Sequence, residues 1–165
     1  MTSPLPPSAE RVRAAAARLG LAVAIREMPQ STRSAEEAAA ACGCAVAQIV
    51  KSLVFAGADS GEPCLLLVSG RNRVDQDGVA AAIGEALVRP DGARVRAWTG
   101  FAIGGIPPFG HDRPMRTFID RDLLAFDRVW AAAGTPNAVF AIDPQVLAAA
   151  AGARTISMTG DESTA

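Results

Sequence analysis

Chemically reactive side chains are scarce in this sequence of 165 residues. It contains one histidine, His111, and three cysteines, Cys42, Cys44 and Cys64. A structural zinc site needs about four closely spaced Cys or His ligands, and a disulfide framework uses an even number of cysteines. We therefore expect no metal site, no cofactor and no disulfides, and unpaired thiols indicate a cytoplasmic protein.

Strong charge and long apolar segments are also missing. The formal net charge is -1 at pH 7, whereas non-specific binding to duplex DNA needs many phosphate contacts. We expect no sequence-specific DNA partner and, for any nucleic acid, contact at one small patch. No segment approaches the roughly 18 apolar residues of a membrane span. The Pro-rich segment 1–8 has no apolar core, so we expect neither a signal peptide nor a membrane partner.

The motifs of common catalytic sites do not occur. There is no G-x-S-x-G elbow, no P-loop and no G-x-G-x-x-G fingerprint. As a general base, His111 would need an orienting carboxylate, and we do not expect the adjacent Asp112 to face it. We therefore expect His111 at the surface and the cysteines buried as ordinary packing residues.

Lysine occurs only once, and every other basic side chain is arginine. This residue, Lys51, lies in the apolar, β-branched run 49–55, which is typical of a buried strand. Two interpretations remain open from the run alone. The stem of Lys51 packs at a sheet edge while its head reaches water, or a site there requires a compact ammonium that a planar guanidinium cannot replace.

A second unusual segment, 99–110, is rich in glycine and proline. Its central residues are Gly104, Gly105, Ile106, Pro107, Pro108 and Phe109. The prolines have no N–H group, so the other four residues supply all the backbone donors. Glycine permits close backbone approach, and rigid, exposed amides can stabilise a developing oxyanion. An ordinary structural turn is the alternative.

Periodicity and capping residues predict one α+β domain around a mixed sheet. Helices are expected at 8–19, 34–42, 75–84, 91–98 and 143–152, with a short turn at 46–48. Strands are expected at 21–27, 49–55, 64–69, 115–120, 129–130, 138–142 and 155–158. Ser8 and Ser34 are the expected caps of the first two helices. We place the domain at 8–158, with a flexible segment 1–7 and a frayed tail 159–165.

The ordered motifs resemble those of the YbaK family, free-standing relatives of the editing domain of bacterial prolyl-tRNA synthetase. The resemblance covers roughly residues 10–158. Its segments are STRSAEEAA (31–39), QIVKSLVF (48–55), GRNRVD (70–75), TG (99–100), GGIPPFG (104–110), DRDLLAFD (120–127) and VWAAAGTPNAVF (129–140).

This resemblance implies a fold, a reaction and a set of site residues. The implied fold is a mixed sheet curled toward a barrel with helices outside. The implied reaction is hydrolysis of the ester between a wrong amino acid and the 3′-terminal adenosine of tRNA, without a metal and with help from the substrate's 2′-hydroxyl. The partner would be the 3′ acceptor end of mischarged tRNA, alongside a tRNA synthetase. The implied catalytic residues are Lys51, Gly104, Gly105, Ile106 and Pro108, and the implied substrate-binding residues are Thr32, Ser52, Arg71, Arg73, Asn137 and Ala138.

Three functions remain open at this point. The favoured one is a trans-acting aminoacyl-tRNA deacylase, in which Lys51 holds the 3′ end or the ester carbonyl. The alternatives are a non-catalytic module that binds a tRNA end or nucleotide, and a hydrolase of small aminoacyl esters. We expect the tRNA-binding patch to contain Arg71, Arg73, Arg113 and Arg116. Ala138 stands where the synthetase's domain carries a histidine, so the amino acid is left unassigned.

Overall fold

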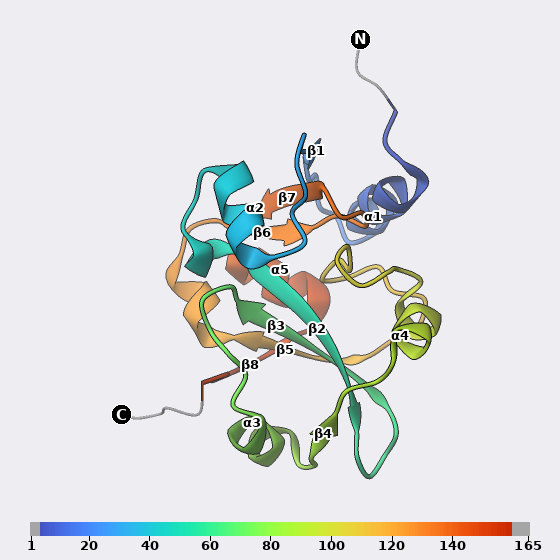
Figure 1. Cartoon of the computed structure of the whole chain (residues 1–165), viewed down its shortest axis with the longest axis vertical. Coiled ribbons are helices and arrows are strands. Elements are labelled where there is room, and N and C mark those ends of the chain that lie inside the picture. The colour runs from blue at the N-terminus through green and yellow to red at the C-terminus, as the bar shows by residue number, and fades with distance from the viewer. Residues whose placement is uncertain (1–3, 160–165) are drawn as a thin grey trace.

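The computed structural model describes residues 4–159, so residues 1–3 and 160–165 of the two expected terminal segments lie outside the described residues. The chain forms one α+β domain (Figure 1). Its helices are α1 (Pro7–Arg18), α2 (Ala35–Cys42), α3 (Gln76–Ile83), α4 (Gly92–Thr99) and α5 (Pro144–Ala151), with 3₁₀ turns η1 (Val46–Gln48) and η2 (Arg121–Ala125). Its strands are β1 (Ile25–Glu27), β2 (Val50–Gly57), β3 (Pro63–Ser69), β4 (Leu87–Val88), β5 (Arg116–Asp120), β6 (Val129–Ala132), β7 (Ala138–Ile142) and β8 (Arg154–Ile156).

The strands form two sheets, so the expected single barrel-like sheet is wrong. The larger, mixed sheet has the order β4-β2-β3-β5-β8, and the smaller, antiparallel sheet has the order β1-β7-β6. A parallel bridge between Ile49 and Trp130 joins them at the start of β2. Barrel closure requires continuous pairing from strand to strand. The strands β1, β4 and β8 are only two or three residues long and cannot provide it.

Local sequence signals explain most helix ends. Ser34 and Glu37 form the predicted capping box at the start of α2. The predicted cap at Ser8 is wrong, because α1 begins at Pro7, whose fixed φ and missing N–H suit the first helical turn. The predicted strand 21–27 is also too long, since pairing with β7 begins only at Ile25.

The core has three parts, and their arrangement positions the site. The main cluster lies between α1, α5 and one face of each sheet, and a second lies on the other face of the larger sheet beside α3. A third, smaller cluster packs α2 against Ile49, Trp130 and Val139. Helix α2 therefore covers the seam between the two sheets, beside β6 and the start of β2 (Figure 1).

Candidate active site

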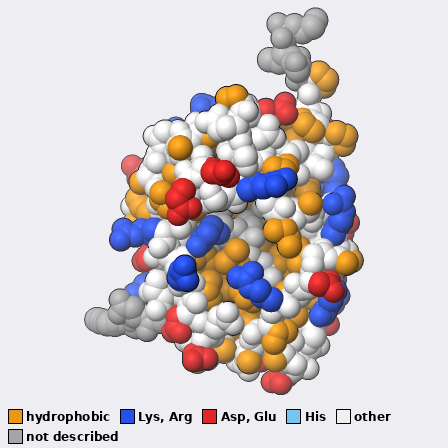
Figure 2. Space-filling model, in the orientation of Figure 1, with side chains coloured by type: hydrophobic (Ala, Val, Ile, Leu, Met, Phe, Trp, Pro, Cys, Tyr) orange, Lys and Arg blue, Asp and Glu red, His pale blue; other side chains and the backbone are white. Residues whose placement is uncertain are grey.

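A cleft of about 820 Å³ opens at the seam between the two sheets. Its walls come from the start of α2, the first half of β2, the 70–73 corner, the 103–106 loop and the facing strands β6 and β7. This face of the molecule is hollowed, with apolar side chains in and below the hollow and Lys and Arg side chains around it (Figure 2). The cleft thus brings together the two segments that the sequence singled out, although they lie about fifty residues apart in the chain.

Lys51 lies in this cleft, and its side chain is hydrogen-bonded to a backbone carbonyl. Its Nζ donates a 2.5 Å hydrogen bond to the carbonyl oxygen of Asn72. Burial is the main cause that lowers the pKa of Lys51, and nearby Arg73 lowers it further, whereas Glu36 and Asp120 raise it. A lysine with a depressed pKa gives up its proton more readily than one in water.

The corner that carries Asn72 is itself anchored to a buried carboxylate. The Asn72 amide Nδ2 donates to Asp120 Oδ2 and to Asp122 Oδ2, both at 2.8 Å. Asp120 is 1% exposed and also accepts from the backbone N–H of Ser69 at 3.0 Å. These hydrogen bonds hold the 70–73 corner in place, and with it the Asn72 carbonyl that accepts from Lys51. Asp120 thus positions Lys51 indirectly.

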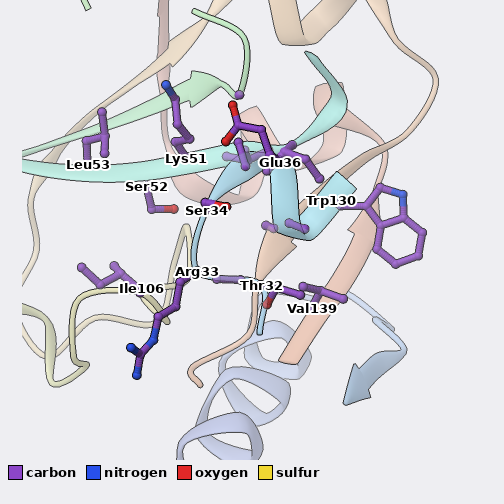
Figure 3. A pocket seen from close by; sticks show the side chains of 18 of the residues that line it. Thr32, Arg33, Ser34, Glu36, Lys51, Ser52, Leu53, Ile106, Trp130 and Val139 are labelled. Atoms are coloured by element: carbon purple, nitrogen blue, oxygen red, sulfur yellow. The ribbon is translucent and has the colours of Figure 1, made fainter. Parts of the chain in front are cut away.

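Lys51 and Ser52 reach different parts of the cleft. Successive side chains of a strand point to opposite faces, and Figure 3 shows Lys51 and Ser52 on opposite sides of β2, with Ser52 on the side where Ile106 lies. The Ser52 hydroxyl is buried and has no hydrogen-bond partner among residues 4–159. An unpaired buried hydroxyl costs about 1–3 kcal/mol, so this group favours a ligand that hydrogen-bonds to it.

The glycine-rich loop contains two amides without a hydrogen-bond partner among the described residues. Gly104 and Ile106 line it, and in the described part of the chain neither amide donates a hydrogen bond. Gly105 differs, because its N–H donates to the Ala102 carbonyl at 3.1 Å and its own carbonyl accepts from the Gly134 N–H at 2.8 Å. The Gly105 amide is therefore engaged in the turn that shapes the loop.

Two side chains brace this loop. The Arg33 stem lies beside Gly104, since a Cβ at that glycine would come within 3.2 Å of Arg33 Cγ. The His111 ring is half-buried, and its Nε2–H donates to the Pro107 carbonyl at 2.7 Å. The expectation of a surface histidine is wrong, because the ring is partly buried against the loop, where it contacts the Pro107 carbonyl. Pro108 is buried and does not line the cleft.

The remaining predicted binding residues are divided between the cleft and the core. Thr32 lines the cleft, and its Oγ1 donates to the Pro136 carbonyl at 3.0 Å. Asn137 and Ala138 do not line it. The Asn137 side-chain amide donates to the Met28 carbonyl at 2.9 Å, and Ala138 faces the main core. Val139, its neighbour on the opposite face of β7, lines the cleft instead.

The predicted four-arginine patch is wrong as a single surface. Arg71 and Arg73 line the cleft, but Arg113 pairs with Glu62 and Arg116 pairs with Glu85. Arg116 lies opposite Cys64, at the hairpin end of β3, whereas the cleft lies at the other end of that strand. The cleft gains Arg33, which the sequence reasoning missed. Its place beside Thr32, directly before a capping box, was the available signal.

Neither a metal centre nor a membrane-spanning helix is found within the described chain. No group of three or more His, Cys, Asp or Glu side chains in residues 4–159 could hold a metal ion. None of the helices described above is long and apolar enough to cross a membrane.

The cleft and its loop lie within a segment that matches a known family. The sequence model of the aminoacyl-tRNA editing domain matches residues 29–150. A solved structure described as a candidate trans-editing enzyme for prolyl-tRNA synthetase is 46% identical, with a TM-score of 0.89 over 94% of this chain and 99% of that one. The solved protein APE2540 is 26% identical, with a TM-score of 0.82 over 89% and 97% of the two chains. Protein YwhH of Bacillus subtilis (strain 168) is 28% identical over 74% of this chain and 78% of its own length.

Proposed function

Because this chain belongs to the aminoacyl-tRNA editing domain family, we propose that it is a trans-acting deacylase that hydrolyses mischarged aminoacyl-tRNA. The observation that carries the proposal is the chemistry of one wall of the cleft. There, Gly104 and Ile106, whose amides donate no hydrogen bond in the described structure, line the same cleft as the unpaired Ser52 hydroxyl. Three donors without protein partners suit a carbonyl oxygen that becomes negatively charged.

The cations of the cleft suit the other end of this substrate. Lys51, Arg33, Arg71 and Arg73 all line it, and the 3′ end of tRNA presents phosphates and ribose hydroxyls. We assign Lys51 to the terminal nucleotide or the ester carbonyl, and the two arginines of the corner to the phosphates. A few basic side chains suffice for one strand end, which agrees with a net charge of -1.

In the proposed reaction, water adds to the ester carbonyl while its oxygen is held by the donors of the loop and Ser52. The attacking water passes a proton toward the substrate's 2′-hydroxyl, as the family resemblance suggests. The bond between the carbonyl carbon and the ribose 3′ oxygen then breaks, and that oxygen takes up the proton that the 2′-hydroxyl passes on. The products are a free amino acid and tRNA with its 3′-hydroxyl restored. The protein contributes orientation and charge stabilisation, so no side chain has to act as a nucleophile.

A deacylation assay over a panel of mischarged tRNAs tests this function. We expect ester hydrolysis well above the spontaneous rate for at least one amino acid, and abolition or strong reduction of that activity in Lys51→Met. Binding without hydrolysis of any member would instead identify a non-catalytic tRNA-binding module. Equal hydrolysis of aminoacyl-tRNA and of minimal aminoacyl-adenosine esters would identify a general ester hydrolase.

A further inference from the structure

Glu36 is the one acidic residue among the described residues that line the cleft, which it shares with four basic residues. It lies in the first turn of α2, and Figure 3 shows its carboxylate extending from that helix on the side where Lys51 lies. Its negative charge acts on Lys51, yet no ion pair joins the two groups in the described structure. A carboxylate in this position therefore has room to accept a hydrogen bond from a ligand.

The neighbouring Glu37 performs the structural duty that an acidic residue at a helix start normally has. The Oε1 atom of Glu37 accepts a hydrogen bond from the backbone N–H of Ser34, which closes the capping box. The same oxygen accepts a hydrogen bond from the Ser31 hydroxyl at 3.2 Å. Glu36 makes no hydrogen bond to any residue that the structure describes. Helix capping therefore does not account for Glu36, although an acidic side chain here also interacts favourably with the helix dipole.

An aminoacyl ester differs from every other part of the tRNA end in carrying a basic amine. Its α-amino group takes up a proton near neutral pH, while the attached nucleotides contribute only anionic phosphates and neutral hydroxyls and bases. A cleft for this ligand needs positive charge for the phosphates and one negative group for the amine. Four cations and a single carboxylate match that distribution.

We propose that Glu36 binds the α-ammonium group of the aminoacyl ester and thereby distinguishes a free aminoacyl end from one whose amine is acylated. The inference rests on the proposed deacylase function and extends it to the class of ester that the cleft accepts. A peptidyl or N-blocked ester has no ammonium and leaves the carboxylate without a partner. The predicted substrate class is therefore aminoacyl-tRNA with a free amine.

The test compares Glu36→Gln with wild type on matched substrates. The aminoacyl-tRNA that wild type hydrolyses fastest is prepared with its amine free and with its amine acetylated. Wild type is expected to prefer the free amine by about tenfold or more in kcat/KM, the scale of a charge-assisted hydrogen bond. Glu36→Gln should lose most of that preference by slowing only on the free substrate. Glu27→Gln, an exposed acid on β1 outside the cleft, should behave as wild type.

A binding experiment separates this inference from the proposed function. The probe is adenosine whose 3′ position carries the same amino acid through an amide bond, with a free or an acetylated amine, and titration calorimetry measures Kd. Tighter binding of the free-amine probe by wild type, lost in Glu36→Gln, supports the assignment. An equal effect of Glu36→Gln on both forms, or no effect on either, overturns it while deacylation persists. Absence of deacylation by wild type overturns the proposed function, and this inference falls with it.

Discussion

The ammonium of Lys51 is hydrogen-bonded to the backbone carbonyl of Asn72, whose side chain is tied to the buried carboxylate of Asp120. The one lysine of the chain thus has a neutral hydrogen-bond partner and forms no ion pair among the described residues. A cation held in this way retains its attraction for an anionic ligand. The Asp120 carboxylate hydrogen-bonds to the Asn72 side chain and forms no ion pair with Lys51.

Replacing Lys51 tests this arrangement. Lys51→Met keeps an apolar stem but loses the charge, and we expect kcat/KM for deacylation to fall roughly tenfold to hundredfold, equivalent to about 1.5–3 kcal/mol. Lys51→Arg keeps the charge but replaces a compact ammonium with a longer planar fork. It should rescue little, because the Asn72 carbonyl already limits the space at 2.5 Å. Melting curves must show both variants folded, and full activity of folded Lys51→Met contradicts the role of the lysine.

Alanine substitutions at the two loop glycines, Gly104 and Gly105, should have different effects. A Cβ at Gly105 would come within 2.8 Å of the Thr135 backbone nitrogen, so Gly105→Ala should destabilise the fold, since overpacking costs about 1–3 kcal/mol. A Cβ at Gly104 meets only the flexible Arg33 stem, but its φ of +101° strains other residues. Gly104→Ala should therefore remain folded while its misaligned amide lowers kcat by as much as 10²–10³, the usual effect of losing an oxyanion donor.

Thermal melting and single-turnover deacylation distinguish these two outcomes. A lowered Tm is expected for Gly105→Ala, and a lowered rate at little changed Tm is expected for Gly104→Ala. If folded Gly104→Ala hydrolyses its best substrate within about twofold of wild type, the loop amide does not stabilise the oxyanion.

The arginines of the cleft should determine how tRNA binding depends on salt. Each phosphate contact contributes roughly one unit to the slope of log K against log salt concentration. The double variant Arg71→Ala, Arg73→Ala should therefore flatten the slope by up to about two units. The matched double variant Arg113→Ala, Arg116→Ala removes the same charge from residues already paired with Glu62 and Glu85. An equal slope change in both variants would show that net charge, and not the cleft, attracts tRNA.

His111 should make the fold sensitive to mild acid. Burial lowers the pKa of His111 below its ordinary 6.5, so the unfolded chain binds a proton before the folded chain as the pH falls. Stability is then unaffected above about 6.5 and decreases below it, toward the folded pKa. His111→Gln keeps a donor for the Pro107 carbonyl but does not titrate. Its Tm should fall less than that of wild type between about pH 6.5 and 5, and parallel Tm profiles would contradict the assignment.

Local signals made much of the fold predictable. The capping box at Ser34 and the strand expected at 64–69 are both confirmed, because short-range patterns determine such elements. The separation into two sheets was not predictable, since it depends on strands of two or three residues whose pairing is decided by distant partners. The order of the elements along the sequence does not show which of these short strands pair.

The site was predictable in its segments but not in its contacts. In the amino-acid sequence, Lys51 stands out as the only lysine and Gly104 stands out by the composition of its loop. The engagement of the Gly105 amide, the isolation of the Ser52 hydroxyl and the pairing of Arg113 with Glu62 all result from three-dimensional proximity. The residue type determines which hydrogen bonds or ion pairs a side chain can form. Only the packed structure determines whether a neighbouring residue already forms them.

Because the cleft lies at a seam between two sheets, the residues that we propose to bind the ester belong to a different sheet from those that form the opposing wall. Lys51 and Ser52 belong to the larger sheet, while Trp130 and Val139 form the opposing wall from the smaller one. Between the described strands of the two sheets, backbone pairing is limited to the Ile49–Trp130 bridge, so side-chain volume in the shared core sets their spacing. Ala138 is fully buried in that core, so we expect a larger residue there to change the width of the cleft without contacting the proposed ester site. Selection for a new substrate size could then act on such remote positions while the groups that we propose for hydrolysis stay unchanged.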